Sequence, residues 1–300
     1  EVVSALQPKA RGRYLDGTLG GGGHSAAILE ASSPDGFLYG CDRDTEALCA
    51  ARERLKPYSE RLETHQCNFT EADQWIAPRS LDGILLDLGV SSHQLDTPER
   101  GFSFQKDGPL DMRMDNSQGM TAADVVNTYD ELELVKIFKE FGEERFARQI
   151  ARAIVAERKS EAFATSTQLA GLIVKVVPFI PGKSSGHPAK RVFQALRIEV
   201  NGELDALGSA VPQALDALRV GGRILVLSYQ SLEDRIVKRA LGAASVSSAP
   251  LDLPIELPEH APTLRLVVRG AEQASEQEIS ANPRSASVRL RAAEKIRQAA

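Results

Sequence analysis

The chain has 300 residues, of which 42% are hydrophobic and 26% are charged, and its formal net charge is −5. This composition is typical of a folded globular protein and excludes a disordered chain, a collagen-like fibre and a coiled coil. The longest apolar run, residues 169–180, is too short and too interrupted to span a bilayer, and no basic-then-apolar leader opens the chain. Because the three cysteines lack metal-ligand spacing, we expect a cytoplasmic protein without a metal site.

The first ninety residues alternate between short apolar runs and helical periodicity. The predicted strands are 14–16, 36–42, 61–67 and 82–88, and the predicted helices are 25–31 and 45–55. Residues 82–88 are apolar on both faces, as in the central strand of a parallel sheet. This alternation predicts βαβ units, and therefore a doubly wound α/β sheet.

The alternation stops after a turn-rich loop over 91–119, and apolar residues then recur at helical spacing. The expected helices lie within 131–141, 146–154 and 193–200. Beyond residue 202 we expect a helix that stops at Gly221-Gly222, a buried strand at 223–228, a helix at 232–241 and edge strands at 263–268 and 287–292. The sequence thus predicts one doubly wound domain, residues 1–106 and 200–300, interrupted by a helical insertion over 107–199.

Charge is distributed unevenly along the chain. Between Lys136 and Arg197, twelve Lys or Arg stand against five Asp or Glu, a local balance of +7 that leaves −12 for the remainder. Because clustered basic side chains attract phosphates, this segment is the candidate contact with a nucleic acid.

A glycine-rich string, Asp-Gly-Thr-Leu-Gly-Gly-Gly-Gly-His-Ser, runs from Asp16 to Ser25 between the first strand and the first helix. Such a turn lets backbone N–H groups approach an anionic group closely. Asp16, directly before the glycines, would repel a pyrophosphate but can accept hydrogen bonds from an ammonium. The third glycine of the dinucleotide motif is also missing after Gly20 and Gly22. The pattern therefore favours S-adenosylmethionine over a dinucleotide.

Acidic residues end three of the predicted strands: Asp16, Asp42 and Asp87. Because ligands bind beyond the carboxyl ends of parallel strands, we expect the three side chains to line one site. We predict that Asp42 holds the ribose hydroxyls and that Phe69, just after the third strand, covers the adenine. Taken singly, each acid also fits a turn cap, and Phe69 also fits a core position.

Further distinctive sequence strings are spread along nearly the whole chain. Besides the glycine loop they are residues 83–92, 99–104, 107–115, 142–146, 193–201 and 231–238. Together they resemble the bacterial small-subunit ribosomal RNA N4-cytidine methyltransferases, the methyltransferase H family. The resemblance implies a Rossmann-like class I methyltransferase sheet with an inserted all-helical RNA-recognition domain. It also implies methyl transfer from S-adenosylmethionine to N4 of a cytidine in the decoding region.

Cofactor contacts are also implied residue by residue. The resemblance places them at Gly22, Gly23, His24, Asp42, Phe69, Asp87 and Gln94, to which the glycine loop adds Asp16 and Gly20. Two features depart from the family pattern. Its usual His-x-Pro-Val segment is not found in this chain, and Gln230 replaces the usual His before Ser-Leu-Glu-Asp-Arg. If that His takes a proton in the family, this protein must do without it.

The exocyclic amine of cytidine is a weak nucleophile, because its lone pair is delocalised into the ring. Acceptors beside the fourth strand are needed to orient it as charge develops. We predict Asp87 and Ser91 in this role, with Asp111 and Asp115 as further candidates. Asp87 has a competing role as a cofactor ligand, and the sequence does not separate the two. The base must leave its stack, so we expect an extrahelical or single-stranded cytidine.

Six basic residues of the insertion are the predicted RNA contacts: Arg145, Arg148 and Arg152 on one helix face, and Lys190, Arg191 and Arg197 after the next turn. A solvated helix face is the plain alternative. A non-catalytic RNA-binding factor, a methyltransferase with another substrate and a hydride-transferring enzyme also stay open. The sequence does not decide whether naked RNA or an assembled or late-assembly ribosomal particle is the substrate, or whether the protein forms a homodimer.

Overall fold

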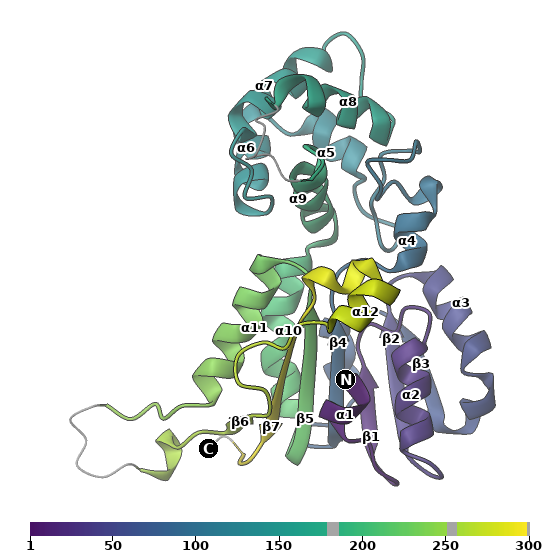
Figure 1. Cartoon of the computed structure of the whole chain (residues 1–300), viewed down its shortest axis with the longest axis vertical. Helices are drawn as coiled ribbons and strands as arrows, with labels where there is room; N and C mark the ends of the chain where they lie inside the picture. The colour runs from purple at the N-terminus through teal and green to yellow at the C-terminus, as the bar shows by residue number, and fades with distance from the viewer. Residues whose placement is uncertain (179–185, 251–256, 299–300) are drawn as a thin grey trace. The chain divides into compact units, whose positions relative to one another are not determined.

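The computed structural model describes residues 1–178, 186–250 and 257–298. The chain forms two compact units, one of Glu1–Gly89 with Leu204–Ala300 and one of Val90–Glu203 (Figure 1). The second unit thus begins 17 residues before the predicted boundary at 107. The reason is packing, because Phe102 is buried in the core of the helical unit and Arg100 donates to the carbonyl of Met114 at 2.9 Å.

The first unit is built on a seven-stranded sheet in the order β3-β2-β1-β4-β5-β7-β6. Its strands are β1 (Arg13–Asp16), β2 (Phe37–Asp42), β3 (Leu62–Gln66), β4 (Leu81–Asp87), β5 (Leu218–Ser228), β6 (Leu264–Leu266) and β7 (Arg289–Lys295). The strands β1 to β5 are parallel to one another, whereas β7 is antiparallel to β5 and to β6. The prediction of two final edge strands is therefore wrong for β7, which lies inside the sheet.

Helices cover both faces of this sheet, as the predicted doubly wound fold requires. They are α1 (Val2–Leu6), α2 (Gly23–Ala31), α3 (Thr45–Arg54), α10 (Glu203–Ala217), α11 (Ser231–Ala244) and α12 (Glu276–Ala281), with short turns η1 (Lys56–Arg61), η2 (Phe69–Gln74), η4 (Pro258–His260) and η5 (Pro283–Ser287). Ile84 and Leu86 of β4 pack in one cluster with α10 and α11. Leu85 packs with α2 and α3 in the other cluster. Neighbouring β4 side chains thus enter opposite cores, as strand geometry dictates.

The glycine pair after the long helix does not act as predicted. The helix α10 ends at Ala217, and Gly221 and Gly222 lie inside β5. The register between β4 and β5 shifts at this point, and Gly221 has a φ of 84°. Glycine is suited to such a bulge because it adopts positive φ without a steric penalty.

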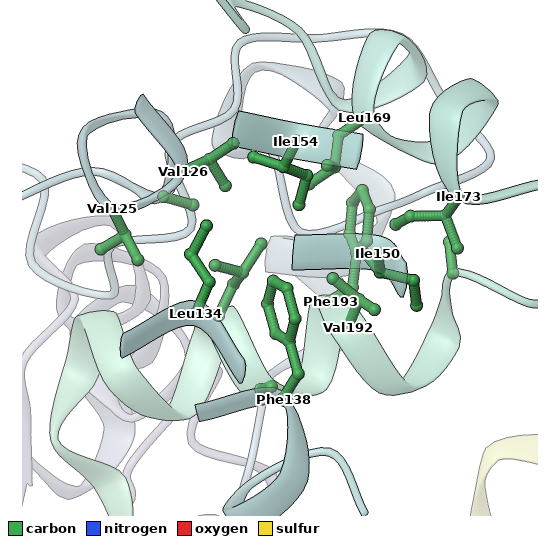
Figure 2. Close-up of a cluster of buried hydrophobic side chains, with 14 of the residues drawn as sticks. Val125, Val126, Leu134, Phe138, Ile150, Ile154, Leu169, Ile173, Val192 and Phe193 are labelled. Carbon is green, nitrogen blue, oxygen red and sulfur yellow. The ribbon is translucent and has the colours of Figure 1, made fainter. Parts of the chain in front are cut away.

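The second unit is helical. Its elements are α4 (Ser92–Asp96), η3 (Pro98–Arg100), α5 (Ala122–Thr128), α6 (Glu131–Glu140), α7 (Ala147–Glu157), α8 (Ser166–Val176) and α9 (Lys190–Asn201). Figure 2 shows its core, where Val125, Leu134, Phe138, Ile150 and Phe193 point toward one another from four helices. The predicted loop over 91–119 therefore contains α4 and η3. No helix in the described part of the chain is long and apolar enough to cross a membrane.

Candidate active site

The glycine loop joins β1 to α2 and needs glycine for two physical reasons. Gly20 and Gly22 have φ values of 49° and 75°, in the left-handed region. A Cβ on Gly22 would also lie 3.2 Å from the Leu55 side chain and 3.3 Å from the Cα of Ala51. The loop therefore packs closely on the chain behind it and leaves the N-terminal N–H groups of α2 available for an anionic group.

Asp16 ends β1 beneath this loop and is only 1% exposed. Its Oδ2 accepts a hydrogen bond from the Ser25 hydroxyl at 2.6 Å, and its Oδ1 accepts one from the Thr18 N–H at 3.2 Å. Burial raises the pKa of Asp16 to about 6. The carboxylate thus braces the loop from inside, and an ammonium would have to use the lone pairs that these two donors leave free.

Asp42 and Phe69 follow the next two strands. The Oδ2 atom of Asp42 accepts from the Gly20 N–H at 2.8 Å, and its Oδ1 accepts from the Asp44 N–H at 2.9 Å. Burial raises the pKa of Asp42. Phe69 begins η2 and borders an apolar cavity of about 200 Å³ between the sheet and α10. Asp42 therefore ties β2 to the glycine loop, while Phe69 adds apolar surface after β3.

Asp87 ends β4 beside β1. Its backbone N–H donates to the Thr18 hydroxyl at 2.6 Å, and its Oδ2 lies 3.4 Å from His24 Nε2. The hydrogen bond with Asp87 raises the pKa of His24. The other oxygen of Asp87, Oδ1, is buried and has no hydrogen-bond partner among the described residues. A buried acceptor without a donor is costly, so this atom marks a place where a ligand donor fits.

The other predicted site residues belong to the helical unit and are bonded within it. Ser91 and Gln94 cap α4 reciprocally, since the Ser91 N–H donates to Gln94 Oε1 at 3.0 Å and the Gln94 N–H to Ser91 Oγ at 3.2 Å. Asp111 is held by three hydrogen bonds from Arg113, one from its backbone N–H at 3.0 Å and two from its guanidinium at 2.8 and 2.7 Å. Asp115 accepts from the Ser117 hydroxyl at 2.6 Å. Each carboxylate thus has a structural role in its own turn.

All of the predicted RNA contacts except Arg197 are exposed, although Arg152 lies 3.8 Å from a Glu131 oxygen and Arg191 donates to the Glu143 carbonyl at 2.9 Å. The described residues that are exposed are Arg145, Arg148, Arg152, Lys190 and Arg191. The predicted stripe along one helix face is wrong for Arg145, because α7 begins only at Ala147. Arg197 donates to both carboxylate oxygens of Glu203 at 2.8 and 2.9 Å, and its side chain is only 16% exposed. The guanidinium of Arg197 is therefore occupied inside the unit.

Three residues at this edge of the sheet were not predicted: Thr18, Ser25 and Tyr229. Thr18 joins the ends of β1 and β4, and Ser25 holds Asp16. Tyr229 directly follows β5, and burial, the charge of Asp87 and a side-chain hydrogen bond with Asp87 together raise the pKa of its phenol. The rule that selects Asp42 and Asp87, a polar residue next to a strand's carboxyl end, also selects Tyr229.

These positions define the class of protein. The strand order reverses at β1 and β4, and ligands of doubly wound sheets bind at such a switch point. The glycine loop and the acids after β2 and β4 all lie at this carboxyl edge. The unpartnered Asp87 oxygen and the acid beneath the glycine loop fit a ligand with amine or ammonium donors better than a pyrophosphate. The first unit is therefore a doubly wound α/β domain whose carboxyl edge suits a ligand that carries a positive charge.

Comparison with known proteins identifies the family. The profile of the MraW methylase family matches residues 1–296, and the chain belongs to that family. A protein from Saccharopolyspora erythraea is 53% identical over 302 residues, which cover all of this chain and 91% of the relative. A protein from Pseudarthrobacter chlorophenolicus is 56% identical over 286 residues, which cover 94% of this chain and 86% of the relative. Both relatives are called ribosomal RNA small subunit methyltransferase H. The predicted family, methyltransferase activity and S-adenosylmethionine cofactor are confirmed.

Proposed function

We propose that this protein methylates the N4 amine of a cytidine in the decoding region of small-subunit ribosomal RNA. Membership of the MraW methylase family and the name shared by its relatives support this substrate. The observation that carries the proposal is the Asp87 carboxylate, which ends a central strand beside the glycine loop and keeps one oxygen without a donor. An exocyclic amine supplies the N–H donors that this acceptor lacks.

Cofactor binding is assigned to the ends of β1, β2 and β3. The N–H groups of Gly21 and Gly23 face the amino-acid carboxylate, since those of Gly20 and Gly22 donate to Asp42 and to the Leu19 carbonyl, and the lone pairs of Asp16 receive the ammonium. Asp42 holds the ribose hydroxyls and Phe69 packs against the adenine. His24 and Gln94 are further proposed contacts. When bound, S-adenosylmethionine supplies an electrophilic methyl group on a positively charged sulfur.

Asp87 is assigned to binding the N4 amine of the target cytidine. Its carboxylate accepts one N–H of N4, which fixes the nitrogen in line with the methyl carbon. Methyl transfer to N4 would leave this nitrogen with a positive charge. A carboxylate aimed at this nitrogen stabilises the developing charge and takes the proton that N4 then releases. Ser91, Asp111 and Asp115 are weaker candidates, since each already serves a local turn.

The helical unit is assigned to the RNA. Arg148 and Arg152 on α7, and Lys190 and Arg191 at the start of α9, are exposed cations available to phosphates. We propose an assembled or late-assembly ribosomal particle as the substrate, because a folded particle holds a cytidine away from its neighbours. We expect the protein in the cytoplasm, where such particles form. A homodimer is not needed, since one chain carries every residue named above.

The test is mass mapping of modified nucleosides in small-subunit RNA from cells with and without this protein. We expect one cytidine to lose an N4-methyl group in its absence and to regain it when the wild-type chain, but not Asp87→Ala, is restored. Purified small subunits and naked RNA, each incubated with the enzyme and labelled cofactor, then distinguish the two substrate forms. An unchanged methylation map would refute the proposal. Adenosylhomocysteine binding without any methylation would instead favour a non-catalytic RNA-binding factor.

A further inference from the structure

Tyr229 occupies a defined position at the carboxyl edge of the sheet. It directly follows β5, and its backbone N–H donates to Glu233 Oε2 at 2.9 Å. Glu233 is 2% exposed, so this anchor is buried, whereas Tyr229 itself is 36% exposed. A single exposed aromatic residue is ordinary on a protein surface. The position of Tyr229, and not its exposure, therefore carries the inference.

Strand pairing places Tyr229 beside Asp87. Leu227 is the register partner of Asp87, and the Leu88 N–H donates to the Leu227 carbonyl at 3.0 Å. Tyr229 follows Leu227 by two residues and so emerges at the same edge. Burial, the charge of Asp87 and a side-chain hydrogen bond with Asp87 all raise the pKa of its phenol. The ring is thus neutral at physiological pH and sits next to the proposed acceptor of the amine.

The residues assigned to the cofactor occupy the other half of this edge. The glycine loop follows β1, Asp42 ends β2 and Phe69 follows β3. The strands lie in the order β3-β2-β1-β4-β5. Because the cofactor residues take the carboxyl ends of β1, β2 and β3, the carboxyl ends of β4 and β5 are left for the methyl acceptor. In-line transfer requires the acceptor on the far side of the methyl group from sulfur, so a target base belongs over these two strands.

We propose that the ring of Tyr229 is the surface on which the target cytosine stacks while the Asp87 carboxylate accepts its N4 amine. A base taken out of its stack loses contact on both faces, and an aromatic side chain replaces one of them. The inference rests on the proposed function, because it assumes that a nucleobase is the methyl acceptor.

The test compares Tyr229→Ala, Tyr229→Leu and Tyr229→Phe with the wild type. Small ribosomal subunits from cells that lack this protein serve as substrate. We expect kcat/KM for subunits to fall about tenfold to a hundredfold in the Ala and Leu variants, from the usual strength of base stacking, and to stay within about threefold in Tyr229→Phe. Adenosylhomocysteine affinity, measured by calorimetry, should stay within about twofold in all three. Tyr58→Ala is the matched control, since Tyr58 lies before β3, at the opposite edge of the sheet.

Three results would overturn the inference. They are an Ala variant with wild-type kcat/KM, a Phe variant as impaired as the Ala variant, and loss of adenosylhomocysteine affinity in step with activity. Equilibrium binding of subunits in the presence of adenosylhomocysteine gives a readout that needs no turnover, and it should weaken in the Ala and Leu variants only. If the wild type itself does not methylate subunits, the proposed function fails. If it does and the Ala variant matches it, only the role of Tyr229 fails.

Discussion

Replacing Asp16 with asparagine should stabilise the free protein at neutral pH and weaken its affinity for the cofactor. The Asp16 carboxylate is almost fully buried, and burial raises its pKa from an ordinary 3.8 to about 6. The folded chain therefore carries a buried anion above that pH. Asparagine has nearly the same shape, and its amide can still bond Ser25 and Thr18, which hold the carboxylate now. The substitution removes the charge and keeps the packing.

The magnitude follows from the pKa difference. Above pH 6 the ionised Asp16 costs the fold about 3 kcal/mol, at 1.36 kcal/mol for each pH unit between the two values. Because the pKa of this carboxyl group is higher in the folded than in the unfolded chain, its ionisation destabilises the fold. This cost is absent below pH 3.8, where the group is protonated in both states, and it grows as the pH rises toward 6. With about 2–4 °C of melting temperature per kcal/mol, Asp16→Asn should melt at least about 6 °C above the wild type at pH 7.5.

The assay is thermal unfolding followed by circular dichroism at several pH values between 4.5 and 7.5. Asp35→Asn is the control, because Asp35 is half exposed and follows the C-terminal end of α2, whereas the glycine loop precedes its N-terminal end. We expect its melting temperature to stay close to that of the wild type. Calorimetric titration with adenosylhomocysteine should show weaker binding to Asp16→Asn, because the ammonium loses its counter-charge. A stability difference that does not change with pH would refute the reasoning.

Three further predictions concern activity, RNA binding and stability. Asp87→Ala should abolish methylation of small subunits while the protein stays folded, and near-normal turnover would contradict its role. The double variant Arg148→Glu, Arg152→Glu should weaken RNA binding, and the slope of log affinity against log salt concentration should fall by about one per lost phosphate contact. The control Arg239→Glu, on the exposed face of α11, should change neither. An unchanged slope in the double variant would count against α7 as the contact. Asn201→Ala should destabilise the helical unit by about 2–3 kcal/mol in urea unfolding, because three backbone groups lose their buried partner; a loss below 0.5 kcal/mol would show that water replaces it.

Much of the sheet was predictable because its signals are local. An apolar run between turn residues indicates a buried strand, and the ends of parallel strands meet at one edge, so Asp42 and Asp87 were placed at that edge without a structure. The helices α5 and α8 were missed although their starts are readable. The pairs Thr121 with Asp124 and Thr165 with Gln168 form capping boxes, which are sequence signals of a helix start.

Other features had no local signal. Gly221-Gly222 looks like a helix end by itself, and only the pairing of β5 with β4 makes it a bulge within a strand. Arg197 looks like one more basic residue of a stripe. It is neutralised by Glu203 because the chain turns at Gly202, where φ is 59°. Six residues apart on one continuous helix, these two side chains would not face each other.

The kind of protein can be recognised from the amino-acid order, because periodicity, the glycine loop and the family strings depend on residues close together in the chain. Which polar atoms are free to act depends instead on how the folded chain surrounds them. The carboxylates of Asp16 and Asp87 both end central strands, yet one is bonded on both oxygens and the other keeps one oxygen without a donor. The two donors to Asp16 lie within nine residues of it, whereas the side chain of Asp87 has its neighbour in His24, 63 positions earlier. Contacts over that separation form only when the strands come together, and no local pattern records them.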